Sequence, residues 1–390
     1  MKKIKLMNKI AAVGTDRFDR AVYEVGDGVA APDAIMVRSA ALHDLEFNPE
    51  LLAIARCGAG VNNIPIDRCS DAGIVVFNTP GANANAVKEL VLCALALASR
   101  DVAGGIAWAK SLDGCEDVAK AVEKGKSAFG GVELYGKTLG IVGLGAIGGL
   151  VANVAVHLGM NVIGYDPYIT VDAAWKLSRS IIHAKTLDEI YEKSDYITLH
   201  IPSLDSTRGM INKASIAKMK DGVRLINLAR ADLAVVADVA EALESGKMAA
   251  YVTDFPTNET VKVPKIVNIP HLGASTEEAE DNCAVMAADE LIEYITTGNI
   301  RNSVNFPSTD MPATGEMRVC VLHRNIPEMI AKLSAGISAA GCNIDNMLNR
   351  SKKDNAVCIF ELSEKLGADA QAKLVDALSA IDGVMRVRVI

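Results

Sequence analysis

The sequence predicts an α/β protein with two doubly wound parallel sheets and a separate C-terminal module of the βαββαβ type. Short apolar runs alternate with helical patterns over most of the chain, which favours parallel strands covered by helices. A glycine-rich turn stands between two of these runs. After about residue 316 the order of elements changes to strand, helix, two strands, helix and strand, which indicates an independent ferredoxin-like unit.

Residues 1 to about 100 contain three apolar runs that each end in polar residues or in a glycine turn. Ligands of open α/β sheets bind beyond the carboxyl ends of the strands, so we expect these ends to line one crevice. Two guanidinium groups in such a crevice suit a phosphate or a carboxylate. Surface ion pairs are the alternative interpretation for either arginine. The residues at the three ends are Arg38, then Arg56 with the turn Gly58, Ala59, Gly60 and Val61, and finally Asn78.

Residues 137–166 carry a nucleotide-binding motif. Gly143, Gly145 and Gly148 stand in GxGxxG spacing between an apolar run and a helical segment, and Asp166 follows the next apolar run. The glycines would allow a tight turn, the approach of a pyrophosphate to the helix start, and close packing of helix on strand. Asp166 would accept hydrogen bonds from ribose hydroxyls, and no arginine directly follows it. The motif therefore predicts a Rossmann domain that binds NAD rather than NADP.

Later strands end in residues suited to the oxidation of an alcohol. Hydride removal from a secondary alcohol requires the hydroxyl proton to leave at the same time, and a histidine, with an ordinary pKa of about 6.5, can accept it near neutrality. A carboxylate on the other ring nitrogen would fix the tautomer. An arginine can hold a substrate carboxylate through two parallel hydrogen bonds. The candidates for these three roles are His271, Glu259 and Arg230.

The domain organisation follows from the same patterns. Residues 301–315 are rich in proline, serine, threonine and asparagine, which is typical of a linker. Residues 101–130 carry several lysines among glycines and are interpreted as a solvated helix, with a lid or a subunit contact as alternatives. We expect a substrate-binding domain from residues 1–100 and 277–308, a dinucleotide-binding domain at 101–276, a linker at 309–316 and the C-terminal module at 317–390.

Composition argues against several other classes of protein. The net charge of −8 and the pI of about 5.4 do not favour binding to nucleic acid or to an acidic membrane. The eight cysteines are scattered without a CxxC pair, so we expect reduced thiols and no metal site. No apolar run reaches 18 residues, and the lysine-containing start lacks the long apolar core of a signal peptide. We therefore expect a soluble, cytoplasmic protein.

Several segments together resemble the NAD-dependent D-2-hydroxyacid dehydrogenases, in the branch that carries a C-terminal ACT domain. They are MVRSA, RCGAGVNNI, VFNTPGANANAVKEL, GKTLGIVGLGAIG, LHIPSLDSTRGMI, INLAR and PHLGASTEEAE, and the resemblance covers essentially the whole chain. It implies a flavodoxin-like substrate domain beside the Rossmann domain, and a homodimer or homotetramer. The implied activity is NAD-dependent oxidation of 3-phospho-D-glycerate to 3-phosphooxypyruvate, the first step of L-serine biosynthesis.

The resemblance also implies roles for particular residues. Arg230, Glu259 and His271 would be the catalytic triad, and the two N-terminal arginines with the glycine turn would hold the substrate. The chain departs from the family pattern after Arg230, where Ala231 and Asp232 follow, and in the stretch DFPTNE before Glu259. Besides the three glycines, the implied cofactor contacts are Ala146, Ile147, Asp166, Ile201, Leu228, Ala229, Arg230, Asp254, His271, Gly273 and Ala274.

The C-terminal module resembles ACT domains that bind serine, so L-serine is an implied effector. His323, Asn325 and Asn343 match the serine ligands of those domains, whereas Glu328 replaces a common glycine and would crowd the site. An ACT domain that only dimerises is the alternative. Two other functions stay open: a dehydrogenase of another D-2-hydroxy acid, and a dinucleotide-sensing protein without turnover.

Overall fold

The structure is a computed structural model that describes residues 1–314 and 316–390. The chain divides into two compact units, and each is described here by itself. Unit 1 contains Met1–Ala82 and Glu280–Ile390, and unit 2 contains Asn83–Ala279. The chain therefore passes between the units twice, at 82–83 and at 279–280.

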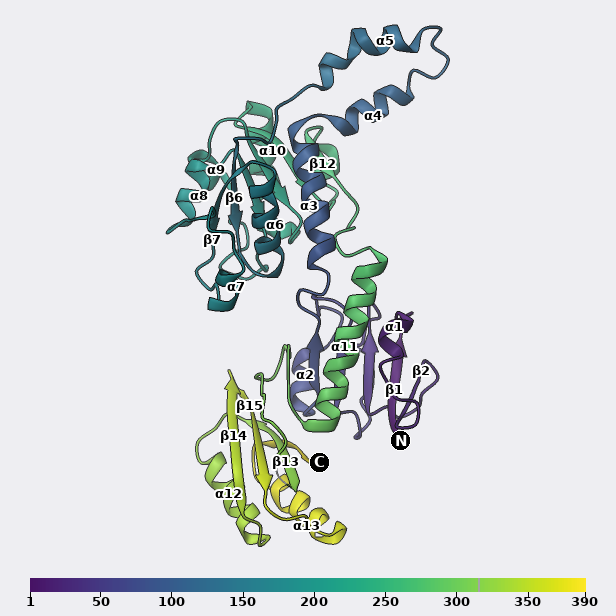
Figure 1. The fold of residues 1–390 in the computed structure, drawn as a ribbon, viewed down its shortest axis with the longest axis vertical. Helices are drawn as coiled ribbons and strands as arrows, with labels where there is room; N and C mark the ends of the chain where they lie inside the picture. The colour runs from purple at the N-terminus through teal and green to yellow at the C-terminus, as the bar shows by residue number, and fades with distance from the viewer. Residues whose placement is uncertain (315) are drawn as a thin grey trace. The chain divides into compact units, whose positions relative to one another are not determined.

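Unit 2 is a parallel sheet of seven strands covered by helices, in the order β12-β11-β10-β9-β6-β7-β8 (Figure 1). This order reverses at β6, which is the Rossmann arrangement that places a nucleotide at the carboxyl end of the central strands. The predicted doubly wound cofactor domain is confirmed. The strands are β6 (Thr138–Val142), β7 (Asn161–Tyr165), β8 (Ile182–His183), β9 (Tyr196–Leu199), β10 (Val223–Asn227), β11 (Met248–Thr253) and β12 (Ile266–Asn268).

The helices of unit 2 follow their sequence signals. In α8 the Thr186 hydroxyl accepts a hydrogen bond from the Glu189 amide at 3.3 Å, which is the N-cap contact that the spacing predicts. Residues 101–130 contain two short helices, α4 and α5, without a buried residue, and they extend away from the sheet (Figure 1). The helices are α3 (Ala84–Ser99), α4 (Val102–Lys110), α5 (Val118–Gly125), η1 (Lys126–Phe129), α6 (Ala146–His157), α7 (Val171–Trp175), α8 (Leu187–Lys193), α9 (Lys213–Lys218), η2 (Ala231–Leu233), α10 (Val236–Ser245) and η3 (Thr260–Lys262).

Unit 1 contains a second parallel sheet, in the order β2-β1-β3-β4-β5, which is the flavodoxin-like order expected for the N-terminal region. Its central strands β3, β4 and β5 are buried up to their last residues, because helices cover both faces, and β4 and β5 end in the partly exposed Arg56 and Asn78. The elements are β1 (Lys2–Met7), α1 (Ala12–Thr15), β2 (Tyr23–Gly26), β3 (Ala34–Val37), β4 (Ala53–Arg56), α2 (Ile66–Asp71), β5 (Val75–Asn78) and the long helix α11 (Glu277–Thr297).

The C-terminal module has the predicted βαββαβ order and forms an antiparallel sheet, β14-β15-β13-β16. Alternate residues of its central strands serve two cores: Val319 and Val321 pack with the module's helices, whereas Cys320 and Leu322 join the core of the N-terminal sheet. The elements are β13 (Met317–Arg324), α12 (Met329–Ala339), β14 (Ile344–Lys352), β15 (Asn355–Leu362), α13 (Ala368–Ser379) and β16 (Val384–Val389).

Residues 298–314, after α11, are packed rather than loose; residue 315 of the predicted linker lies outside the described residues. Ile300 and Thr309 exchange backbone hydrogen bonds of 3.0 and 2.9 Å, and Phe306 is fully buried. Among the described residues, no single helix is long and apolar enough to cross a membrane; α3 and α4 meet that criterion only as a pair, and they are bent by 74° at their junction.

Candidate active site

The glycine turn after β6 has the geometry that a dinucleotide requires. Gly143 has a φ of +91°, and a Cβ there would lie 2.5 Å from the carbonyl oxygen of His200. A Cβ at Gly148 would lie 1.9 Å from the Gly143 carbonyl oxygen, so the helix can approach the strand only with glycine at this position. Gly145, by contrast, has nothing within 4 Å of a Cβ, so its side of the turn is open. This open side, directly at the start of α6, fits a pyrophosphate.

Two predicted contacts lie beside this turn. Ala146 and Ile147 are the first residues of α6, where the backbone amides have no partner within the helix. Ile201, just after β9, borders the turn: its Cγ2 would be 2.8 Å from a Cβ at Gly143. These positions lie at the glycine turn, and their contact with a cofactor stays a prediction.

Asp166 lies next to the glycine turn at the end of β7. Its carboxylate accepts hydrogen bonds from the Leu144 amide at 2.8 Å and from the Tyr168 amide at 2.9 Å. It also borders a cavity of about 550 Å³ whose wall includes Trp175 and Arg179. A carboxylate fixed by two amides beside a cavity fits the acceptor that the adenine ribose of NAD needs.

The ends of β10, β11 and β12 bring three charged residues to one edge of the sheet. The strands are adjacent and parallel, and Arg230, Asp254 and His271 follow them in turn. The side chain of Asn227 fixes the backbone after β10: it donates to the Arg230 carbonyl oxygen at 2.8 Å and accepts from the Ala229 amide at 3.2 Å. The predicted contact segment Leu228 to Arg230 is therefore held in one conformation.

Asp254 is the most buried of these groups, with 1% of its surface exposed. Burial raises the pKa of its carboxyl, while the charges of His271 and Arg230 and a hydrogen bond from the Gly273 amide act in the opposite direction. All three groups therefore lie within electrostatic reach of Asp254. Ala274 follows Gly273 in the same turn.

His271 is exposed, and its ring packs against Phe255 with centroids 4.6 Å apart and an interplanar angle of 47°. Glu259 lies nearby in the chain, where its amide donates to the Thr257 hydroxyl at 3.3 Å. Within 1–314 and 316–390, no hydrogen bond or ion pair joins Glu259 to His271, so that pairing stays a prediction.

Unit 1 brings its own predicted residues together. Val37, Arg56 and Asn78 are direct neighbours across β3, β4 and β5, and Arg38 follows β3. Arg56 Nε donates to the Arg38 carbonyl oxygen at 3.2 Å. The guanidinium of Arg56 lies over Gly58, whose φ of +143° favours glycine.

The turn after β4 is tied to the end of β5. Asn78 Nδ2 donates to the Ala59 carbonyl oxygen at 2.7 Å, and the Thr79 amide donates to the Gly58 carbonyl oxygen at 3.1 Å. We call residues 58–61, which include Gly60 and Val61, the substrate turn. Arg38 forms an ion pair of 2.5 Å with Glu280 on α11, and both side chains are 42% exposed.

Comparisons with known proteins agree with this geometry. Residues 103–273 match the family model described as D-isomer specific 2-hydroxyacid dehydrogenase, NAD binding domain. The chain is 32% identical over 358 residues to D-3-phosphoglycerate dehydrogenase of Haemophilus influenzae, and the match covers 89% of this chain and 83% of that protein. The chain belongs to the D-isomer specific 2-hydroxyacid dehydrogenase family.

Other relatives of this family show how much of each protein the match covers. The chain is 36% identical over 297 residues to D-3-phosphoglycerate dehydrogenase of Bacillus subtilis, which covers 74% of this chain. It spans only about half the length of several such relatives: 54% of the Bacillus protein and 52% of that from Archaeoglobus fulgidus. A solved 3-phosphoglycerate dehydrogenase of Entamoeba histolytica with bound NAD+ is 26% identical with a TM-score of 0.61, over 78% of this chain and 98% of that one.

Two residues near the candidate site escaped the sequence analysis. Phe255 was noted only as a departure in the stretch DFPTNE, although an aromatic residue next to Asp254 was a signal for a ring contact. His200, partly buried behind the glycine turn, has a pKa lowered by burial to about 4 and is neutral. Its side chain contacts the Thr198 hydroxyl at 3.0 Å.

The predicted effector residues do not come together within one chain. His323 and Asn325 lie at the end of β13. Asn343 precedes β14 and lies near the start of β13, because Ile344 of β14 and Met317 of β13 both pair with Leu362 of β15. His323 is buried, and Asn343 Nδ2 donates to Asp345 and Ser363, both at 3.0 Å. A serine site built from all three residues would need a second copy of the chain.

Glu328 lies at the start of α12. Its φ is +65°, a conformation that favours glycine, and its side chain is 73% exposed and pairs with Lys332 at 3.3 Å. Its effect on a serine site stays a prediction.

Proposed function

We propose that this chain oxidises 3-phospho-D-glycerate to 3-phosphooxypyruvate with NAD, the first step of L-serine biosynthesis. The observation that carries the proposal is the cluster of Arg38, Arg56 and the substrate turn at adjacent strand ends of a doubly wound sheet. Two guanidinium groups next to the backbone of the substrate turn suit a substrate with a phosphate as well as a carboxylate. The similarity to phosphoglycerate dehydrogenases supports the same substrate.

Each residue has a defined task in this proposal. Arg230 and the substrate turn bind the carboxylate, and Arg38 with Arg56 bind the phosphate. His271 accepts the hydroxyl proton of the substrate, with Glu259 approaching the ring in the substrate complex. NAD, when bound at the glycine turn and Asp166, supplies the hydride acceptor. The domain ranges predicted from the sequence belong to this proposal, with residues 1–100 and 277–308 binding substrate and residues 101–276 binding NAD.

The ion pair between Arg38 and Glu280 favours a second candidate, a dehydrogenase of an unphosphorylated D-2-hydroxy acid. A guanidinium that already has a carboxylate partner is less available for a phosphate. In this case only Arg230 and the substrate turn would contact the acid, and Arg38 would be a surface residue.

The test uses two substrates that differ only in the phosphate. The purified chain with NAD is given 3-phospho-D-glycerate or D-glycerate, and NADH formation is followed. We expect Arg56→Ala to raise the KM for the phosphorylated acid about 10- to 100-fold, since hydrogen bonds to charged groups contribute about 1.5–3 kcal/mol, and to leave D-glycerate turnover within about twofold. Turnover of D-glycerate by the unmodified chain, with a KM that Arg56→Ala barely changes for either acid, would favour the second candidate.

Three further parts of the proposal concern partners and location. The enzyme is proposed to be a cytoplasmic homodimer or homotetramer, and L-serine is proposed to inhibit it through the ACT module. Because the three effector residues lie at opposite ends of one sheet, serine inhibition should require the oligomer. Turnover at dilutions that dissociate the oligomer should then become insensitive to serine.

A further inference from the structure

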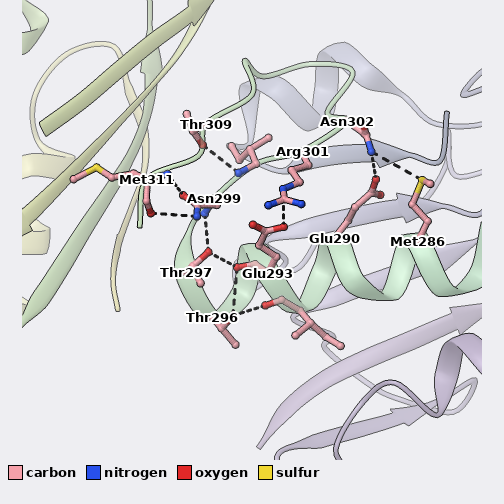
Figure 2. A network of polar contacts seen from close by, with 12 residues as sticks. Met286, Glu290, Glu293, Thr296, Thr297, Asn299, Arg301, Asn302, Thr309 and Met311 are labelled. Atoms are coloured by element: carbon pink, nitrogen blue, oxygen red, sulfur yellow. Dashed lines mark hydrogen bonds and ion pairs between the residues drawn. The ribbon is translucent and has the colours of Figure 1, made fainter. Parts of the chain in front are cut away.

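Glu290 is a buried carboxyl on α11 outside the proposed catalytic groups. Only 5% of the residue is exposed. Oε1 accepts a hydrogen bond from Asn302 Nδ2 at 2.6 Å, and Oε2 has no hydrogen-bond partner among the described residues (Figure 2). A buried polar atom without a partner costs free energy, so this carboxyl calls for an explanation beyond packing.

Asn302 connects Glu290 to the end of β5. Its φ of +52° places it in the left-handed region, which an asparagine adopts at a cost unless other contacts hold it. Its carbonyl oxygen accepts a hydrogen bond from the Asn78 amide at 3.4 Å. The next residues continue the pairing, because the Val304 amide donates to the Val76 carbonyl oxygen at 2.9 Å.

The end of β5 in turn holds the substrate turn, through the hydrogen bonds of Asn78 and Thr79 to Ala59 and Gly58. We propose that Glu290 is a positioning residue that holds the substrate turn through Asn302 and Asn78. The inference rests on the proposed function for its kinetic meaning, since the substrate turn is assigned there. The geometry itself lies entirely within unit 1.

The surroundings of Glu290 favour its neutral form. Burial raises its pKa to about 8, the hydrogen bond from Asn302 acts in the opposite direction, and the charges of Asp289 and Glu293 on the same helix act in the same direction as burial. Both neighbouring carboxylates already have basic partners: Asp289 pairs with Arg17 at 2.8 Å, and Glu293 with Arg301 at 3.2 Å. From β4, the thiol of Cys57 lies within electrostatic reach of Glu290, and burial raises its own pKa to about 12, so it is uncharged.

Ionisation of Glu290 as the pH rises should therefore weaken the hydrogen bonds that join Asn302, Asn78 and the substrate turn. Because the folded-state pKa is raised, the stabilisation from this group is complete below the ordinary glutamate pKa and is lost as the pH rises through about 8. Among the described residues no ion pair joins Glu290 to a cation, so above that value hydration of the buried charge becomes favourable. A cavity of about 540 Å³, lined by Glu290, Met286 and Asn302, gives water a route to it.

The experiment measures KM and kcat of the full chain for 3-phospho-D-glycerate and for NAD between about pH 7 and pH 9. In the unmodified protein, KM for the acid should rise above about pH 8 while KM for NAD and kcat stay level. Glu290→Gln keeps the acceptor oxygen and cannot ionise, so its KM should stay low across the range. Glu293→Gln, one turn along α11 with a side chain that is 24% exposed, is the matched control and should keep the rise.

Glu290→Ala removes the acceptor and should raise KM for the acid about tenfold at every pH, the size expected for one lost hydrogen bond. Amide hydrogen exchange gives a second readout that does not depend on turnover. Exchange of residues 76–79 and 302–304 should be faster in Glu290→Ala than in the unmodified protein, and unchanged in Glu293→Gln.

The outcomes separate this inference from the proposed function. Faster exchange at these residues without any turnover of 3-phospho-D-glycerate would support the positioning role and reject the substrate. Normal turnover with unchanged KM and exchange in Glu290→Ala would overturn the positioning role. If the alanine variant does not fold, a high-pH rise in KM that persists in Glu290→Gln overturns it equally.

Discussion

The arginines at the strand ends and those of the C-terminal module illustrate two uses of one side chain. Arg38 is 42% exposed at the end of β3, where its charge can reach a ligand. Arg318 in β13 is 4% exposed, and its guanidinium donates to Glu361 at 2.5 Å, to the Thr297 carbonyl oxygen at 2.7 Å and to the Met311 carbonyl oxygen at 2.9 Å. The first arrangement is suited to binding, and the second joins the module to α11.

A second arginine of the module strengthens this contrast. Arg388 in β16 donates to the carbonyl oxygens of Tyr294 and Ile295, at 3.1 and 2.8 Å, in the last turn of α11. Carbonyls at a helix C-terminus lack partners within the helix and carry partial negative charge, so cations are stabilised there. The module is therefore attached to the helix through which the chain returns from unit 2 to unit 1.

Exposure and hydrogen-bond partners, rather than residue type, therefore decide the role of an arginine. An exposed arginine loses little free energy when it exchanges water for a substrate, whereas the guanidinium of a buried arginine needs a partner for its charge and its N–H groups. This difference gives three predictions with decreasing expected effects.

The largest effect is expected from Arg318→Met, which leaves the buried Glu361 carboxylate without its cation. Breaking a buried ion pair from one side costs about 3–5 kcal/mol, so the thermal transition of the C-terminal module should shift down strongly in calorimetry. The double variant Arg318→Met with Glu361→Leu should recover much of this loss, because no charge remains buried. A single variant as stable as the unmodified protein would show that the junction does not depend on this pair.

A smaller effect is expected from Arg230→Lys at the end of β10. The lysine keeps the charge but loses the planar fork, so KM for the acid should rise by about one to two powers of ten, which corresponds to about 1.5–3 kcal/mol. The stability of the protein should stay within about 0.5 kcal/mol, the usual range for a surface substitution. A large loss of stability instead would place Arg230 with the structural arginines.

The smallest effect is expected from Glu328→Gly. This substitution tests whether glycine is favoured at Glu328, which has a positive φ as Gly143 does. Gly143 in the glycine turn already has the residue that its φ of +91° favours, whereas Glu328 has a φ of +65° with a side chain. Glycine there should raise the unfolding free energy by about 0.5–1 kcal/mol. The control is Lys332→Ala, which removes only the exposed ion pair with Glu328 and should change stability by less. A lower stability of the glycine variant would mean that contacts of Glu328 outweigh its backbone strain.

Local patterns were enough to predict much of this molecule. The glycine motif lies in the predicted strand, turn and helix. Two adjacent hydroxyl residues, Ser275 and Thr276, precede α11, and the Thr276 hydroxyl accepts the hydrogen bond from the Ala279 amide at 3.1 Å. Adjacent hydroxyl residues offer the same acceptor, so the sequence alone cannot choose between them.

The sequence by itself determined the two doubly wound sheets, the glycine turn and the βαββαβ module, because hydrophobic period and glycine geometry act over a few residues. Only the tertiary structure decided which charges are buried. It placed Phe255 against His271, separated Asn343 from His323, joined Arg318 to the end of α11 and left Glu290 beside Asn302. These contacts join residues on different elements or loops, and their free energies depend on burial and pairing that local sequence patterns do not encode.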